Sequence, residues 1–166
     1  MATEHLLSLG HRRIGMICGH REAEVSLQRR DGYMLALVHA GIPYEEELVY
    51  YGDFTEAAGV LGLNTLMRKR ITGVVCISDV TAIGAYRAAQ TMGLAIPRDL
   101  SIVGYDDTTL TGIVNPGLTS VNQNPELIGR SAATLIRSVL HHRSVGDIVI
   151  HPSLTIRGST AVPCGK

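Results

Sequence analysis

The sequence has few aromatic residues, no net charge and no long apolar run. It contains no tryptophan, one phenylalanine and six tyrosines among 166 residues, and its formal net charge at pH 7 is zero. A neutral chain lacks the basic surface expected of a domain that binds nucleic acid directly. No apolar stretch approaches the ~20 residues that a membrane-spanning helix needs, so we expect no contact with a membrane.

Cysteine is also scarce. Of the three cysteines, Cys18 and Cys76 stand in apolar, strand-like runs, and Cys164 lies near the end of the chain. We expect reduced, packed cysteines in a cytoplasmic protein rather than a disulfide framework. The opening stretch MATEHLLSLGHRR is too short and too polar for a secretory signal, which agrees with that expectation.

Motifs for catalysis and for tightly held cofactors are missing as well. The sequence has no G-x-S-x-G nucleophile motif, no G-x-x-x-x-G-K-[ST] phosphate loop and no G-x-G-x-x-G dinucleotide motif. Its seven histidines are scattered, and no Cys/His pair has the spacing of a zinc site. The sequence therefore predicts no catalytic residue, no metal ion, no cofactor and no enzymatic activity.

What the sequence does contain is an alternation of strand-like and helix-like segments. The apolar runs IGMIC, ELVYYG, GVVCIS, LSIVGYD and LTSVNQ are separated by segments with helical spacing, such as VTAIGAYRAAQTMG. This alternation predicts βαβ units with a parallel sheet, and continuously apolar strands indicate helices on both faces. The expected fold is α/β, a doubly wound parallel sheet with flavodoxin-like strand order.

The two ends of the chain fall outside that alternation. TEHLLSLG predicts about two turns of helix, and NPELIGRSAATLIRSVLHH predicts a longer helix with Asn124 as N-cap and Pro125 in its first position. The apolar stripe of this longer helix consists of Ile128, Ala132, Leu135 and Val139. The following run, DIVIHPSLTIRGST, is β-like and broken by Pro152. These pieces look like elements of another layer or another lobe.

Polar and aromatic side chains follow the predicted strands at their carboxyl ends. In an open parallel sheet these ends lie at one edge, where ligands bind. The candidate binding residues at this edge are Arg29, Phe54, Ser78, Asp79, Asp106 and Gln123. Phe54 would stack on a ring, while Arg29 and Asp106 would bind its hydroxyls or heteroatoms, at roughly 1.5–3 kcal/mol for each charge-assisted hydrogen bond. The set suits a small polar ring such as a sugar or a nucleobase.

All of these residues except Gln123 also have a simpler structural explanation. Ser78 and Asp79 stand where a helix begins, so N-capping alone accounts for at least one of them. Asp106 is compatible with a solvated turn and Arg29 with a cation on a helix surface. Phe54 is compatible with a cover over the sheet edge. Their common position at one edge is what favours a binding site.

Several stretches along nearly the whole chain carry a family likeness: HLLSLGHRRIGMICG, RRDGYMLAL, SDVTAIGAYRAAQTMGLAIPRDLSIVGYDD, LTSVNQNPELIG and LTIRGST. In this order they resemble the lactose-repressor/galactose-repressor (LacI/GalR) family of bacterial transcription regulators. The resemblance implies a two-lobed, periplasmic-binding-protein-like (type I) effector domain behind a helix-turn-helix headpiece. It also implies homodimers whose affinity for operator DNA changes when a sugar, sugar phosphate or nucleobase binds between the lobes.

The resemblance also assigns roles to residues and segments. It places effector contacts on Arg29, Phe54, Asp79, Asp106 and Gln123. Ser78 departs from the family, which usually has asparagine before that aspartate, so the identity of the effector stays open.

The same resemblance divides the chain. Residues 12–122 would form the C-terminal lobe of the effector-binding domain. Residues 1–11 and 123–166 would be a crossover helix, a helix and a tail that belong partly to a mostly missing N-terminal lobe. The headpiece would be absent, so that operator DNA is bound only through a segment outside this chain.

Two other functions share the predicted fold. A periplasmic-type sugar-binding protein of a transporter has the same architecture, although the stretches GYDD and LTIRGST argue against it. A small α/β enzyme could use the same sheet edge, but the sequence offers no nucleophile–base pair and no cofactor loop.

Overall fold

A computed structural model describes residues 1–164, and within them six strands form one sheet in the order β2-β1-β3-β4-β5-β6. The strands are β1 (Ile14–Cys18), β2 (Val49–Tyr51), β3 (Gly73–Cys76), β4 (Ser101–Tyr105), β5 (Thr119–Asn122) and β6 (Ser153–Thr155). The first five pair in parallel, and β6 pairs antiparallel with β5. The predicted α/β fold with a doubly wound, flavodoxin-like sheet is confirmed, and β6 extends it by one antiparallel strand.

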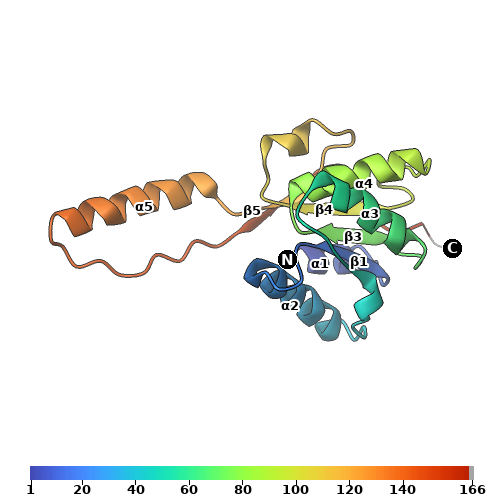
Figure 1. Ribbon diagram of the computed structural model, residues 1–166, viewed down its shortest axis with the longest axis horizontal. Coiled ribbons are helices and arrows are strands. Elements are labelled where there is room, and N and C mark those ends of the chain that lie inside the picture. Colours follow the sequence, from blue (N-terminus) through green and yellow to red (C-terminus); the bar gives the residue numbers. More distant parts are fainter. Residues whose placement is uncertain (165–166) are drawn as a thin grey trace.

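Helices cover both faces of the sheet (Figure 1). The helices α1 (Ala2–Ser8) and α2 (Glu24–His39) lie on one face, and α3 (Glu56–Met67) and α4 (Asp79–Thr91) lie on the other. Short 3-10 turns, η1 (Glu46–Leu48) and η2 (Thr109–Gly112), precede β2 and follow β4. The last helix, α5 (Pro125–Leu140), stands away from the sheet.

Two apolar cores result from the alternation of side chains along the strands. The core under α3 and α4 takes Ile17, Val74, Cys76 and Ile102 from the strands, together with Leu63, Leu66 and four alanines of α4. The core under α1 and α2 takes Ile14, Met16, Val75 and Val103, together with Leu6, Tyr33 and Leu37. The sheet is therefore buried on both faces, as its continuously apolar strands predict.

Helices α3 and α4 approach each other closely because glycines lie at their contact. A methyl group on Gly84 would lie 2.0 Å from the carbonyl oxygen of Glu56, and one on Gly59 would lie 2.0 Å from the carbonyl oxygen of Thr81. Real atoms do not approach this closely, so any side chain at either position forces the helices apart. This contact fixes the start of α4, which carries Ser78 and Asp79 at the sheet edge.

The opening helix and the end of the chain pack on this same lobe. Leu6 of α1 is fully buried, and His11 just after α1 is buried at the amino ends of the strands. Its Nε2 lies 2.9 Å from the carbonyl oxygen of Ala161, and its Nδ1 lies 2.8 Å from Oγ1 of Thr72. Ser159 donates a hydrogen bond of 2.6 Å to the carbonyl oxygen of Ile102. Two of the segments that fell outside the predicted alternation, α1 and the end of the chain, therefore pack on this lobe.

One segment does stand apart, and we call residues 125–152 the arm. Figure 1 shows α5 projecting from the sheet and the chain running back along it to β6. No residue of α5 is buried, and Ile136, Val139 and Leu140 are more than half exposed. Asn124 does precede the helix, but its side chain donates to the carbonyl oxygen of His151 (3.3 Å) instead of capping α5. Of the β-like run at 147–160, only β6 forms strand.

Candidate functional site

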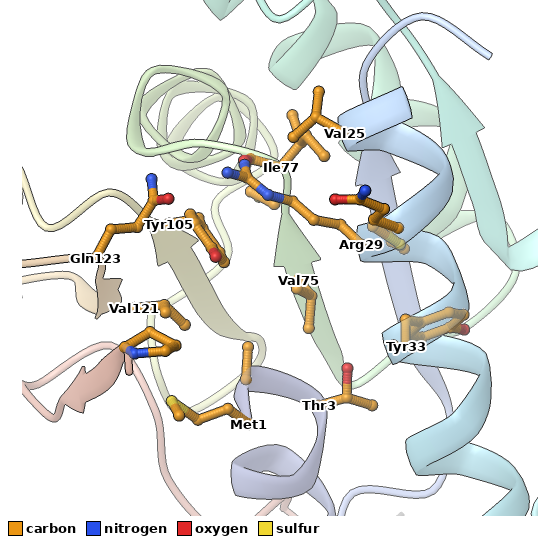
Figure 2. Close-up of a pocket in the computed structure, with 16 residues that line it drawn as sticks. Met1, Thr3, Val25, Arg29, Tyr33, Val75, Ile77, Tyr105, Val121 and Gln123 are labelled. Carbon is orange, nitrogen blue, oxygen red and sulfur yellow. The ribbon is translucent and has the colours of Figure 1, made fainter. Parts of the chain in front are cut away.

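A pocket of about 380 Å³ lies on the α1 and α2 side of the sheet, close to the carboxyl ends of β3, β4 and β5. Its polar rim includes Arg29 and Gln123, and its apolar floor includes Val75, Ile77 and Val121. Figure 2 shows Arg29 extending from α2 toward Tyr105, with Gln123 beyond Tyr105 and with Met1 and Thr3 below Val75. A cavity with a few polar groups over an apolar floor is typical of a small-molecule site.

Arg29 comes from the second turn of α2 and is held above the strand ends. Its Nη1 donates a hydrogen bond to the carbonyl oxygen of Ile77, at the end of β3. Its guanidinium carbon lies 3.5 Å from the centre of the Tyr105 ring, at the end of β4. The helix places Arg29 there because Ser26 and Tyr33, on neighbouring turns, are buried against the sheet. Arg29 therefore lies over the edge of the sheet at the ends of β3 and β4.

Asp106 follows Tyr105 in a left-handed backbone conformation, with φ of 108°. Such a conformation is costly for a residue with a side chain and is common at binding sites. Gln123 donates from Nε2 to Oδ1 of Asp106 over 2.7 Å. Burial raises the pKa of Asp106, and the positive charge of Arg29 and the Gln123 hydrogen bond oppose that rise. Arg29 and Gln123 thus line the pocket, and Asp106 lies beside it, hydrogen-bonded to Gln123 and under the influence of the Arg29 charge.

Asp79 is fully buried and its carboxylate is already engaged. It accepts hydrogen bonds from Oγ of Ser120 (2.6 Å), from the backbone N–H of Thr108 (2.7 Å) and from Oγ1 of Thr108 (2.9 Å). These donors lie in the loop after β4 and in β5, so Asp79 ties α4 to the loop that carries Asp106. The structure places Asp79 beneath the site rather than among the residues that line the pocket.

Ser78 is the N-cap of α4. Its hydroxyl accepts a hydrogen bond from the backbone N–H of Thr81 (3.3 Å) and lies 2.9 Å from Oγ1 of the same residue. The capping explanation offered by the sequence therefore holds for Ser78, which is half-buried. An N-cap hydroxyl contributes about 0.5–2 kcal/mol to a helix.

Phe54 lies over Gly19, outside the residues that line the pocket. A side chain at Gly19 would lie 2.2 Å from the Phe54 ring, so the glycine provides the space for this aromatic. His20 meets the ring edge-on, with 5.7 Å between ring centres. Phe54 is half-buried, with φ of 67°. It forms the far end of the same sheet edge, beyond β1 and β2.

Two residues with clear contacts were missed in the sequence. Tyr105 stacks on Arg29, and the alternation of β4 could have found it, because Tyr105 lies on the same strand face as Val103. Asp107 was not among the candidate residues. Its carboxylate accepts from Asn122 (3.0 Å) and Thr155 (2.7 Å), and it pairs with Arg157 at 2.7 Å.

Asp107 holds together the two chain segments that join the lobe to the arm. Asn122 ends the outgoing strand β5, while Thr155 and Arg157 lie in and after the returning strand β6. Burial acts to raise the pKa of Asp107, but the hydrogen bonds from Thr155, Arg157 and Asn122 leave that pKa below its ordinary value. The carboxylate is therefore charged at neutral pH and holds together the two segments that join the lobe to the arm. We call this junction of Asn122, Thr155 and Arg157 around Asp107 the neck.

Neither a metal-binding cluster nor a membrane-spanning helix occurs in the part of the chain that the structure describes. No group of three or more His, Cys, Asp or Glu side chains is placed to hold a metal ion among residues 1–164. None of the helices in the same range combines the length and hydropathy needed to cross a membrane.

Comparison with known proteins places these features in context. The model of the family described as periplasmic binding protein-like domain matches residues 3–160. The HTH-type transcriptional regulator CelR of Thermobifida fusca is 40% identical over 137 residues, which are 81% of this chain and 40% of CelR. Among solved structures, the transcriptional regulator CelR-cellobiose complex aligns with a TM-score of 0.86 and 36% identity, over 95% of this chain and 50% of that one.

A LacI family transcriptional regulator from Mycobacterium smegmatis aligns with a TM-score of 0.87 and 36% identity. The alignment covers 98% of this chain and 62% of that one. The chain spans about half the length of the curated relatives it matches.

Proposed function

The chain belongs to the periplasmic-binding-protein-like domain family, and we propose that it is the effector-sensing part of a bacterial LacI-type transcriptional regulator. The resemblance to the LacI/GalR family is confirmed, since the relatives are named as transcriptional regulators and as LacI family members. The observation that carries the proposal is a pocket at the carboxyl edge of the sheet that is lined by Arg29 and by Gln123, which donates a hydrogen bond to Asp106.

The charges at this edge favour a neutral sugar over an anionic ligand. Arg29 supplies the positive charge at the pocket, and the Asp106 carboxylate is near enough for that charge to oppose the rise of its pKa. A donor and an acceptor side by side suit neighbouring hydroxyl groups, which both donate and accept. A phosphate dianion would meet repulsion from Asp106. The relative solved with cellobiose is consistent with a sugar, whereas sugar phosphates and nucleobases are the alternatives.

The arm supports the proposal that this lobe is one of two. The apolar stripe of its helix α5 is exposed at Ile128 and Val139, and Ile136 beside the stripe is exposed as well. An amphipathic helix normally buries that face, and we propose that an N-terminal lobe covers it. Under this proposal residues 12–122 form the C-terminal lobe, and α1 and the tail pack on it.

In the intact regulator, effector bound between the lobes would stabilise one inter-lobe angle and so change the affinity for operator DNA. The regulator would act in the cytoplasm as a homodimer that contacts operator DNA through a helix-turn-helix headpiece. The names of the relatives favour this function over the solute-binding protein of a transporter and over an enzyme.

The test uses the full-length protein that carries this chain. Thermal-shift and calorimetric titrations would compare cellobiose and other neutral sugars with a hexose phosphate and with a purine base. We expect a neutral sugar to bind. Binding of the hexose phosphate or the purine alone would contradict the choice of a sugar.

Asp106→Ala provides the matching variant. We expect it to lose the effector response in an operator mobility-shift assay while it still binds the operator. Loss of operator binding in this variant would show that Asp106 is structural. Failure of every ligand class to bind the wild-type protein would contradict the sensing function itself.

A further inference from the structure

Tyr105 is the platform on which the Arg29 guanidinium rests. The guanidinium carbon lies 3.5 Å above the ring centre, which is within the distance for a strong cation–π contact. Figure 2 shows Tyr105 between Arg29 and Gln123, with its ring at the wall of the pocket. Tyr105 thus stands at the centre of the proposed effector site without belonging to the residues that the sequence singled out.

The position of Arg29 depends on two contacts that come from different strands. The carbonyl oxygen of Ile77, at the end of β3, accepts one N–H of the guanidinium. The Tyr105 ring, at the end of β4, supports its face. An arginine side chain has many rotamers. An arginine that is already held in a single rotamer loses less entropy when a ligand binds. A carbonyl alone leaves the plane of the guanidinium free to turn, whereas a ring beneath it fixes that plane.

We propose that Tyr105 is a positioning residue for effector recognition, because its ring holds the Arg29 guanidinium in the plane that a sugar hydroxyl meets. The inference rests on the proposed function of the site. It adds a residue whose aromatic face, and not its hydroxyl, carries the role. Consequently Tyr105→Phe should keep the affinity for the effector, whereas an aliphatic residue of similar size at this position should lower it.

Binding of cellobiose to the full-length protein, measured by calorimetry, is the first test. For Tyr105→Leu we expect a Kd about tenfold higher, equivalent to about 1.4 kcal/mol. For Tyr105→Phe we expect a loss of less than about threefold. A Kd for Tyr105→Leu equal to that of the wild-type protein would overturn the inference, as would an equal loss in both variants.

A second stacked pair in the lobe provides a matched control. Arg21 lies 4.0 Å from the centre of the Tyr51 ring, away from the pocket. Tyr51→Leu removes the same kind of contact, and we expect the affinity for cellobiose to stay within about twofold of the wild-type value. Thermal unfolding of both leucine variants separates a general loss of stability from a specific loss of affinity.

A double-mutant cycle separates positioning from direct contact between Tyr105 and the sugar. If Tyr105 acts through Arg29, Tyr105→Leu should weaken binding no further once Arg29→Met is present. A further tenfold loss in the Arg29→Met background would show that the ring binds the sugar by itself. That result would contradict the positioning role.

A measurement without ligand keeps the inference testable if cellobiose does not bind. In NMR spectra the side-chain N–H signals of Arg29 should be shifted upfield by the Tyr105 ring, in the wild-type protein and in Tyr105→Phe. The shift should vanish in Tyr105→Leu. An unshifted signal in the wild-type protein would overturn the inference, whatever the ligand.

Titration of the Asp106 carboxyl gives an independent readout. Burial raises the pKa of Asp106, and the charge of Arg29 opposes that rise. Release of Arg29 in Tyr105→Leu should therefore raise the pKa of Asp106 further, and Tyr105→Phe should leave it where it is. An equal pKa in all three proteins would contradict a positioning role. Failure of sugar binding with these signatures present would count against the proposed function alone.

Discussion

The lobe and the arm are built from similar residues but are stabilised in different ways. Helices α3 and α4 bury glycines, alanines and leucines against the sheet, whereas α5 is of comparable length and buries none of its residues. In the lobe, tertiary packing holds the helices, and that packing sets the positions of Arg29 and Asp79. In the arm, α5 is stabilised by its own backbone hydrogen bonds and by the residues at its ends. A polar side chain in the lobe is therefore held by tertiary packing, whereas one in the arm is exposed to solvent.

The largest expected difference in the free energy of unfolding is between the loss of a buried carboxylate in the lobe and the loss of an exposed one in the arm. Asp79→Ala removes the acceptor of three hydrogen bonds in the buried lobe and leaves Thr108 and Ser120 without it. We expect a loss of about 3–5 kcal/mol in the free energy of unfolding. Asp147→Ala in the exposed arm should change it by less than about 0.5 kcal/mol. Urea unfolding of both variants checks the prediction, and a small loss for Asp79→Ala would contradict it.

Glycine to alanine should have opposite signs in the two regions. In α4, Gly84→Ala places a methyl group 2.0 Å from the carbonyl oxygen of Glu56, and we expect a loss of about 1–3 kcal/mol. In α5, the same change at Gly129 meets no atom within 4 Å and favours the helix by about 0.5–1 kcal/mol. Helix content of the arm and thermal unfolding of the lobe give the two readouts. Equal changes in stability for Gly84→Ala and Gly129→Ala would contradict the difference between the lobe and the arm.

The smallest effect on stability is expected from the exposed apolar side chains of α5 in the arm. Ile136→Ser and Leu140→Ser should leave the unfolding of the lobe within about 0.5 kcal/mol, because both side chains are more than half exposed. They should, however, reduce self-association of the 166-residue chain, since exposed apolar stripes tend to be buried by association. Sedimentation at tens of micromolar checks this. A monodisperse monomer before substitution would contradict the expected association.

The strands and the sheet edge could be predicted because both depend on local pattern. Apolar runs and helical spacing are visible over a few residues, and they predicted all five parallel strands and the position of Arg29. The packing of His11 on Ala161 joins residues 150 apart in the chain, and no local pattern announces it.

The site residues show the same limit at shorter range. Asp79 and Asp106 both follow strands, yet one carboxylate points into the lobe and the other toward Gln123. That choice depends on the left-handed backbone at Asp106 and on the donors around Asp79, which only the folded chain brings together. Tyr105 was overlooked because a tyrosine at a strand end is ordinarily a packing residue.

The neck held by Asp107 has a mechanical consequence. The chain leaves the lobe at the end of β5 and returns at the start of β6, and these strands are paired side by side. Because these two strands are adjacent, both ends of the arm are anchored at one place on the sheet. Asp106 directly precedes Asp107 in the chain, so a displacement of this loop would be passed to both ends of the arm through the hydrogen bonds of Asp107 with Asn122 and Thr155.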